Sequence, residues 1–395
     1  MSPSLRFVHL SDTHLGYRQY GLNERLDDWN RATREVIDYA IQNEVDCVVH
    51  SGDLFNSNRV DHTSLIHAIE SLRVLRDAEI PFFVIDGNHD RRKGSQAHTA
   101  LDVLQSLNLC SYLRPERGSL VNATAQINGT NIIGLGYNGA YLKPRLIELS
   151  QQMPGGRNVV VLHAGLAQHI EGGQPEITLS ELEVLRPSTA YLALGHSHNK
   201  FSVDNWIFNP GSPEHYRFSD SNTDRCFYDV TLRGGVPKVT EIAMRGTRRM
   251  ESIEVEYAGD DYAVLGVVQS ELDDAEKGQS LADSLLRIIL KGEASKPPNT
   301  GELKQFVEER YEPFFCTVLD NTLTSEDVLI DAPGTLDDLE KKMFESSFSR
   351  YDEQTSEVAT FARAVLREVV DAQLSNTDDA ESIAQHISRF RREHL

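Results

Sequence analysis

Short groups of aspartate, histidine and asparagine occur at five points along the sequence, each directly after an apolar run typical of a strand. They are Asp12-Thr13-His14, Gly52-Asp53, Gly87-Asn88-His89-Asp90, His163-Ala164-Gly165 and Gly195-His196-Ser197-His198. Open α/β sheets place their ligand sites just past the ends of strands, so we expect these groups to converge on one site.

The chemistry that these residues could carry is two-metal hydrolysis of a phosphate ester. Carboxylate and amide oxygens together with imidazole nitrogens suit a pair of first-row metal ions such as manganese. Two such ions would lower the pKa of a bridging water and neutralise charge on the phosphate. We expect Asp53 to bridge the two ions. The other ligands expected are Asp12, His14 and His198 for one ion and Asn88, His163 and His196 for the other.

The local spacing adds two expectations. Asp12 and His14, like His196 and His198, are two residues apart, which would point both members of a pair to one side of an extended chain. His89 is a candidate proton donor: paired with Asp90, its imidazole would stay protonated near neutral pH, orient the phosphate and protonate the leaving oxygen.

One such motif alone would be weak evidence, because an isolated Asp-x-His or Gly-Asp is more often a turn or a helix cap. All five in this order make coincidence improbable. The other histidines are not assigned to the site. His9 and His50 lie within strand-like runs, where a hydrogen-bonded core role is expected.

The pattern around the motifs predicts an α/β domain over residues 1–220. The expected helices are Leu26 to Gln42, Thr63 to Ala78, Ser95 to Leu107 and Ser180 to Leu185, the last with Ser180 and Glu183 spaced as a capping box. The expected strands are the five runs before the motifs, together with Asn131 to Leu135 and Trp206 to Phe208.

Beyond residue 220 the pattern changes, and two further segments are predicted. Residues 221–330 are expected to form a small α+β capping domain with a hairpin at 225–243, strands at 252–256 and 314–318, and a helix at 281–290. Residues 331–395 are expected to form a pair of helices, because glycine and proline are absent from Thr335 onward and apolar residues recur there at helical spacing. That pair would either pack back on its own domain or dock on a partner, and we favour the partner.

Composition narrows the class of protein. The 395 residues contain no apolar run near the roughly 20 residues of a membrane span. The four cysteines are scattered, which indicates reduced thiols in a cytoplasmic protein. The net charge of -21 is unusual for a nucleic-acid enzyme. It is explained either by the salt-rich cytosol of a halophilic archaeon, which we favour, or by an ordinary acidic protein, and it does not exclude local DNA binding.

The order of the motifs resembles the calcineurin-like metallophosphoesterases. The strings Val8 to Gly16 and Ser51 to Phe55 are similar to the Mre-eleven/SbcD nucleases of double-strand-break repair, and the similarity is dense to about residue 220. This resemblance implies a four-layer α/β/β/α sandwich with a small capping domain and a C-terminal helical pair. It implies two manganese ions on the seven ligands named above, with His89 as the phosphate-orienting acid.

The resemblance also implies an activity and partners. Family members cut DNA as 3′-to-5′ exonucleases on duplex ends and as endonucleases on single strands. They form homodimers through nuclease-domain helices, expected here at 63–78 and 95–107, and their C-terminal helices bind the coiled-coil base of a Rad-fifty/SbcC ABC ATPase. One position departs from the pattern: Asn56 stands where several members have a histidine linked to exonuclease action. The alternatives are a small-molecule phosphodiesterase or phosphomonoesterase, and a scaffold whose metal site only supports the fold.

Overall fold

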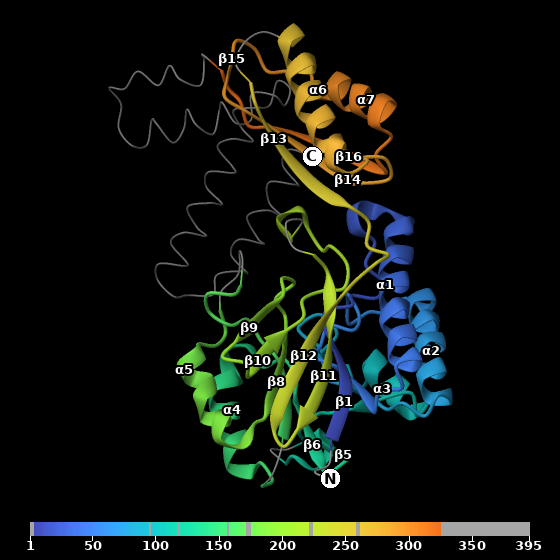
Figure 1. The fold of residues 1–395 in the computed structure, drawn as a ribbon, viewed down its shortest axis with the longest axis vertical. Coiled ribbons are helices and arrows are strands. Elements are labelled where there is room, and N and C mark those ends of the chain that lie inside the picture. The colour runs from blue at the N-terminus through green and yellow to red at the C-terminus, as the bar shows by residue number, and fades with distance from the viewer. Residues whose placement is uncertain are drawn as a thin grey trace, which may run out of the picture. The chain divides into compact units, whose positions relative to one another are not determined.

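The computed structural model describes residues 4–324, apart from residue 95 and the segments 117–118, 156–157, 171–174, 221–223 and 258–260. The predicted C-terminal helical pair, 331–395, lies outside the described residues. The chain divides into two compact units (Figure 1). The first comprises Met1–Ile253, Gln279–Arg287 and Val307–Thr317, and the second comprises the remainder.

Two six-stranded sheets form the centre of the first unit. One has the order β12 (Val236–Ala243), β11 (Cys226–Arg233), β1 (Ser4–Leu10), β2 (Cys47–His50), β3 (Phe82–Val84) and β4 (Ser111–Tyr112). The other has the order β5 (Thr124–Ile127), β6 (Thr130–Leu135), β7 (Asn158–His163), β8 (Tyr191–Gly195), β10 (Ile207–Asn209) and β9 (Phe201–Val203). Strands β1 to β4 run parallel to one another, as do β6, β7, β8 and β10.

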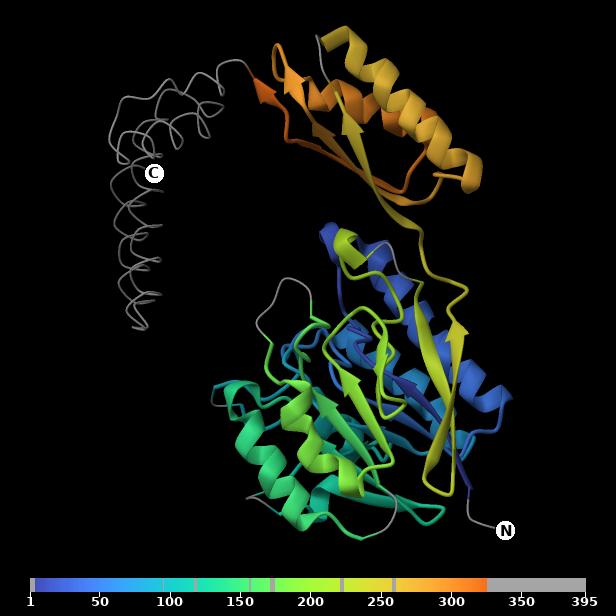
Figure 2. The same ribbon diagram turned by 60° about the vertical axis from the view of Figure 1, so that its left-hand side comes forward.

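Helices cover the outer face of each sheet (Figure 2). The first sheet packs against α1 (Asn23–Gln42), α2 (His62–Asp77) and α3 (Ala100–Ser106), and the second against α4 (Leu142–Gln152) and α5 (Leu179–Leu182). Successive residues of a strand enter different layers, because strand side chains alternate between faces. In β1, Phe7 belongs to the core between the sheets, whereas Val8 belongs to the core under the helices. The predicted four-layer α/β/β/α sandwich is therefore confirmed.

The remaining elements are shorter or lie later in the chain. The short 3-10 helices are Gln19–Gly21, Val121–Ala123, Gly139–Tyr141, Glu183–Ser188 and Phe218–Asp220. The later elements are β13 (Met250–Glu256), α6 (Asp261–Gly278), β14 (Leu285–Lys291), β15 (Glu293–Ala294), α7 (Thr300–Tyr311), β16 (Phe315–Asp320) and β17 (Leu323–Thr324). Strands β13, β14 and β16 form a three-stranded sheet. Within the described residues, no helix is both long and apolar enough to cross a membrane.

Several predicted elements differ from the structure. The predicted hairpin is present as β11 and β12, but β11 pairs with β1, so residues 221–253 extend the first sheet rather than begin a capping domain. The boundary expected at residue 220 therefore lies too early. The segment expected as a helix at 281–290 contains strand β14 instead. Its alternating pattern of buried and partly buried residues, over Leu285–Lys291, suits a strand.

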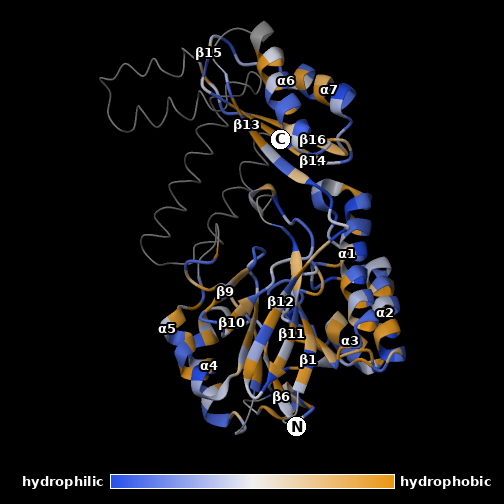
Figure 3. Cartoon of the chain, viewed as in Figure 1, coloured by the Kyte–Doolittle hydropathy of each residue, from blue (hydrophilic) through white to orange (hydrophobic). Residues whose placement is uncertain are grey.

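The predicted helix positions need smaller corrections. Helix α3 begins at Ala100 rather than Ser95, because Thr99 caps it in a capping box with Asp102. The capping box of α5 is formed by Thr178 and Glu181, two residues earlier than the predicted pair. Figure 3 shows hydrophilic and hydrophobic residues interleaved along α1 and α2, as expected for helices with one buried face.

Candidate metal centre

The five motifs meet where the parallel strands of the two sheets end. Leu10 at the end of β1 is level with His50 at the end of β2, and His163 at the end of β7 is level with Gly195 at the end of β8. Several contacts join the sheets at this edge. His163 Nδ1 lies 2.8 Å from the carbonyl oxygen of Ser51, and the His196 amide donates to Asp12 Oδ2 at 3.1 Å. The structure thus brings all seven predicted ligands to one place.

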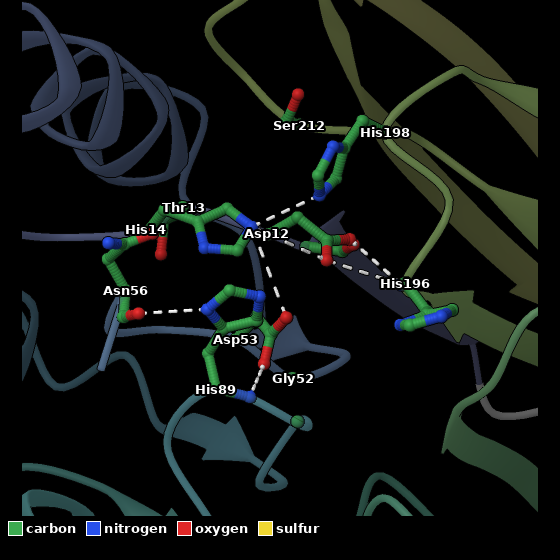
Figure 4. A network of polar contacts seen from close by, with 12 residues as sticks. Asp12, Thr13, His14, Gly52, Asp53, Asn56, His89, His196, His198 and Ser212 are labelled. Carbon is green, nitrogen blue, oxygen red and sulfur yellow. Dashed lines mark hydrogen bonds and ion pairs between the residues drawn. The ribbon is translucent and has the colours of Figure 1, made fainter. Parts of the chain in front are cut away.

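The first set of predicted ligands is closely grouped. His14 Nε2 and His198 Nε2 are 3.2 Å apart, and His14 Nε2 is 3.9 Å from Asp12 Oδ1. One ligand atom from each of these three residues lies within 4.8 Å of the others. Figure 4 shows these side chains pointing toward one another, with Asp53 beside them.

The second set is linked to the first through Asp53. Asp53 Oδ2 lies 3.3 Å from His163 Nε2 and 4.0 Å from His14 Nε2, so one carboxylate oxygen is close to both sets. Asn88 Oδ1 lies 3.1 Å from His163 Nε2 and 2.9 Å from His196 Nδ1. This is the arrangement expected of a carboxylate that bridges two ions.

The charges and burial of these groups fit metal ions. Burial holds the pKa of His14 well below its ordinary value and lowers that of His196 to about 3, so both imidazoles are neutral and have a lone pair to offer. Burial also raises the pKa of Asp12. Burial would lower the pKa of His163 as well, but the Asp53 carboxylate outweighs it and raises the value to about 10. The buried Asp53 carboxylate thus attracts positive charge, and together with the neutral imidazoles of His14 and His196 it forms a donor set that suits dications.

The backbone at the site is strained. Asp12, His14, Asp53 and His196 have φ values of 53°, 43°, 55° and 84°, in the left-handed region that non-glycine residues seldom occupy. The extended conformation expected for the Asp12 and His14 pair is therefore wrong, although their ligand atoms do lie together. Such strain costs about 1 kcal/mol or more per residue and accumulates at functional sites.

Glycines allow the loops to approach one another closely. Gly52 has a φ of 97°, and a side chain there would collide with the His163 imidazole. A side chain at Gly87 would collide with the Asp53 carboxylate. The loops are further tied by backbone hydrogen bonds from the Asp12 amide to the Gly52 carbonyl at 3.0 Å and from the His14 amide to the Asp53 carbonyl at 3.1 Å.

His89 lies at the site, but its partner is not the one expected. Its amide donates to Asp53 Oδ1 at 2.9 Å, and its ring is 4.9 Å from that of His14. Its Nδ1 lies 2.8 Å from the carbonyl oxygen of Asn56 (Figure 4). The buried Asp90 carboxylate instead accepts hydrogen bonds from the amides of Gly87 at 2.7 Å and Phe55 at 3.2 Å. Asp90 therefore ties two site loops together and does not pair with the His89 ring.

The two strand histidines are core groups, as predicted. The buried His9 ring lies 2.9 Å from both the Tyr191 hydroxyl and the Ser51 hydroxyl. His50 Nε2 lies 3.0 Å from the Thr13 hydroxyl. Burial lowers the pKa of both His9 and His50 to about 3, so they are neutral hydrogen-bonding groups.

Two residues at the site were missed by sequence reasoning. The Tyr216 ring lies 4.1 Å from that of His198 and 4.6 Å from that of His14, and it stacks on Tyr17 at 4.7 Å. Glu176 Oε1 lies 3.5 Å from His196 Nε2. Neither residue belongs to one of the motifs, and only the folding of their loops brings them to the ligands.

Comparison with known proteins agrees with this geometry. Residues 5–231 match the model of the calcineurin-like phosphoesterase superfamily domain. A DNA double-strand break repair protein Mre11 from Sulfurisphaera tokodaii is 26% identical over 98% of this chain and 96% of its own length. Relatives of the same name from Saccharolobus solfataricus and Haloferax volcanii are 34% and 30% identical, over 50% and 65% of this chain and only 51% and 56% of their own lengths.

The family match covers both sheets of the sandwich up to β11 and includes all seven predicted ligands. The domain implies a centre of two metal ions, for which these residues are the candidates. The family predicted from the order of the motifs is therefore confirmed, and the chain belongs to the calcineurin-like phosphoesterase superfamily, where its relatives include archaeal Mre11 proteins.

Proposed function

We propose that this protein is a manganese-dependent nuclease that processes DNA ends in double-strand-break repair. The observation that carries the proposal is the placement of Asp53 Oδ2 between two sets of imidazoles, 3.3 Å from His163 Nε2 and 4.0 Å from His14 Nε2. Relatives called DNA double-strand break repair proteins support DNA as the substrate. The mixture of oxygen and nitrogen ligands supports manganese.

The proposed roles of the residues follow from their positions. Asp12, His14 and His198 would hold one ion, Asn88, His163 and His196 the other, and Asp53 both. When bound, the two ions would supply an activated water and neutralise charge on the phosphate oxygens. The protein itself would fix the ligand atoms, because loops from both sheets are hydrogen-bonded to each other at this edge.

His89 is the proposed proton donor to the leaving oxygen. Its Nδ1 lies 2.8 Å from the Asn56 carbonyl, which can only accept, so Nδ1 carries a proton. The other nitrogen would then face the phosphate and, with the ring in its doubly protonated imidazolium form, would orient the phosphate and pass its own proton to the leaving group. The Asn56 carbonyl, and not Asp90, thus holds the ring in this proposal.

The kinds of DNA cleavage, the oligomeric state and the partner are proposed from the family resemblance. We propose 3′-to-5′ exonuclease action on duplex ends and endonuclease action on single strands, in a homodimer formed through α2 and α3 and in partnership with a Rad-fifty/SbcC-like ABC ATPase. A cytoplasmic location is supported by four free cysteines.

The test is cleavage of end-labelled duplex and single-stranded DNA by the purified chain with manganese, with magnesium and with a chelator. We expect manganese-dependent cutting that stops with chelator and is absent from the Asp53→Ala variant. Rapid turnover of bis-p-nitrophenyl phosphate with no cutting of DNA, even with the ATPase added, would instead establish a small-molecule phosphodiesterase. The ladder of products reports the direction of exonuclease action.

A further inference from the structure

Glu176 joins the site from a segment outside the metal-ligand motifs. Residues Leu166 and Ile177 form a parallel bridge, which brings the segment before α5 alongside the loop that follows β7. The Glu176 amide donates to the Gly165 carbonyl at 3.0 Å. The Glu176 side chain is 14% exposed, and that of His196 is 18% exposed, so the two groups meet in a largely buried place.

Three groups surround the Glu176 carboxylate, and each can donate a hydrogen bond. The Gly165 amide donates to Oε2 at 2.5 Å, and the Tyr137 hydroxyl donates to Oε1 at 3.1 Å. His196 Nε2 lies 3.5 Å from the same Oε1. Among the residues that the structure describes, no lysine or arginine forms an ion pair with this carboxylate. The imidazole of a predicted metal ligand is therefore placed, like the Gly165 amide and the Tyr137 hydroxyl, to offer a proton to this carboxylate.

The two nitrogens of the His196 ring face different partners. Nδ1 lies 2.9 Å from Asn88 Oδ1, on the side of the second ligand set, whereas Nε2 faces Glu176. A neutral imidazole has one protonated nitrogen and one nitrogen with a lone pair. If the proton is on Nε2, then Nδ1 is free to bind a metal ion.

We propose that Glu176 is a positioning residue for the second metal ion, which it serves by holding the His196 proton on Nε2. The inference rests on the metal centre proposed above. Histidine ligands commonly donate their second ring N–H to a carboxylate, which fixes the ring and strengthens the metal bond. Here the carboxylate also brings a negative charge close to the ion.

Glu176 and His196 both pack closely against Gly165. A Cβ atom at Gly165 would lie 2.7 Å from Glu176 Oε2 and 3.1 Å from His196 Cδ2. Any side chain at this position would push the carboxylate and the imidazole apart. The glycine of the His163 motif thus has a second use, which is to let the Glu176 segment reach His196.

The geometry predicts why glutamine could not replace this glutamate. The rigid Gly165 amide needs an acceptor, so a glutamine at 176 would turn its single oxygen toward Gly165. Its NH2 group would then face His196 Nε2 and, as a donor, would favour the imidazole tautomer in which Nε2 has the lone pair. The imidazole proton would move to Nδ1, where it blocks the metal ion.

The experiment is a manganese titration of wild type and Glu176→Gln, followed by the loss of the free-ion electron paramagnetic resonance signal. We expect two ions to bind to wild type. In the variant, the first ion should bind as before and the second about 10-fold to 100-fold more weakly. Glu181→Gln is the matched control. Glu181 ties the same segment by accepting from the Thr178 amide at 3.0 Å but touches none of the predicted ligands, so both ions should bind normally.

A second measurement needs no variant. Long-range proton–nitrogen spectra of the metal-free wild-type protein, labelled at histidine, should show the His196 proton on Nε2, and a proton on Nδ1 would overturn the inference. Equal binding of both ions by Glu176→Gln and wild type would also overturn it, as would an equal loss in Glu181→Gln. If wild type fails to bind two ions, the metal centre itself is wrong, which is a separate failure.

Discussion

At the scale of single residues, the site is organised around one carboxylate that faces two sets of imidazoles. Asp53 contacts His163 directly, lies within 4.0 Å of His14, and accepts a hydrogen bond from the His89 amide. Asp12 also has a carboxylate oxygen within 4.8 Å of ligand atoms in both sets, but Asp53 Oδ2 is the oxygen that lies within 4.0 Å of an imidazole nitrogen of each. Loss of Asp53 should therefore affect both ions, whereas loss of a terminal ligand should affect mainly one.

The first prediction is that Asp53→Ala abolishes the binding of both ions. The substitution removes the shared oxygen ligand and leaves neutral imidazoles with less negative charge to attract a cation. The measurement is metal content after dialysis against manganese, with His196→Ala as the comparison that should keep one ion. If Asp53→Ala retains one tightly bound ion, Asp53 does not bridge.

The second prediction separates metal binding from catalysis. His89→Gln should keep two manganese ions and reduce DNA cleavage by about 100-fold to 10,000-fold, the usual effect of removing a proton donor. Metal content and cleavage rate are measured on the same preparation. Loss of manganese from this variant would instead make His89 a ligand, because a pure proton donor is not needed to hold the ions.

The residues of the motifs were predictable because metal chemistry limits their types and because each follows a strand-like run. Glu176 and Tyr216 were not, because a single glutamate or tyrosine in a loop has no distinguishing pattern. The partner of His89 was also not predictable. The sequence favours the neighbouring Asp90, but the turn through Gly87 directs the Asp90 carboxylate to the backbone amides of Gly87 and Phe55.

At the scale of elements, a buried ion network fastens helix α1 to the loop that carries Tyr216. The fully buried Arg25 donates to Asp28 at 2.6 Å, to Glu214 at 3.3 Å and to the His215 carbonyl at 3.0 Å. The next residue, Tyr216, places its ring against His14 and His198. The network thus holds the Tyr216 ring in place beside His14 and His198 of the first ligand set.

The third prediction is that Arg25→Ala lowers the free energy of unfolding by about 3 kcal/mol or more, because it leaves the buried Glu214 carboxylate without its arginine partner, whereas Asp28 keeps Arg31 and Arg248. The measurement is the midpoint of urea unfolding followed by tryptophan fluorescence. Arg34→Ala is the control: its exposed pair with Asp38 on the same helix should cost only about 0.3–0.5 kcal/mol. Equal effects of the two substitutions would contradict the role of burial.

Helices and strands with a clear hydrophobic periodicity were predicted well, whereas the pairing of distant strands was not. The hydrophobic pattern that predicts helix α1 and the hairpin of β11 and β12 lies within the residues of each element. The pairing of β11 with β1 joins residues more than 200 positions apart, and local patterns contain no information about it. A short apolar run such as segment 281–290 fits both the helical and the strand period, and pairing within the three-stranded sheet makes it a strand here.

At the scale of the whole molecule, charge sets the conditions under which the chain is stable. Acidic residues outnumber basic ones by 60 to 39, which gives the net charge of -21. Self-repulsion of this excess opposes the compact state. Salt shortens the range of the repulsion, from about 10 Å at 0.1 M to about 3 Å at 1 M. Surface ion pairs are weakened too, but each contributes little.

The fourth prediction is that potassium chloride stabilises the protein while it weakens DNA binding. Between 0.1 M and 1 M salt, the melting temperature should rise by about 4 °C, the shift that about 1–2 kcal/mol produces in a domain of this size. Over the same range, DNA affinity should fall as counterion release becomes less favourable. Melting is followed by circular dichroism, and binding by fluorescence anisotropy with a labelled duplex. Sucrose at equal osmolality controls for exclusion of solute from the surface. A melting temperature that falls with salt would mean that ion pairs, rather than excess negative charge, dominate the electrostatics of folding.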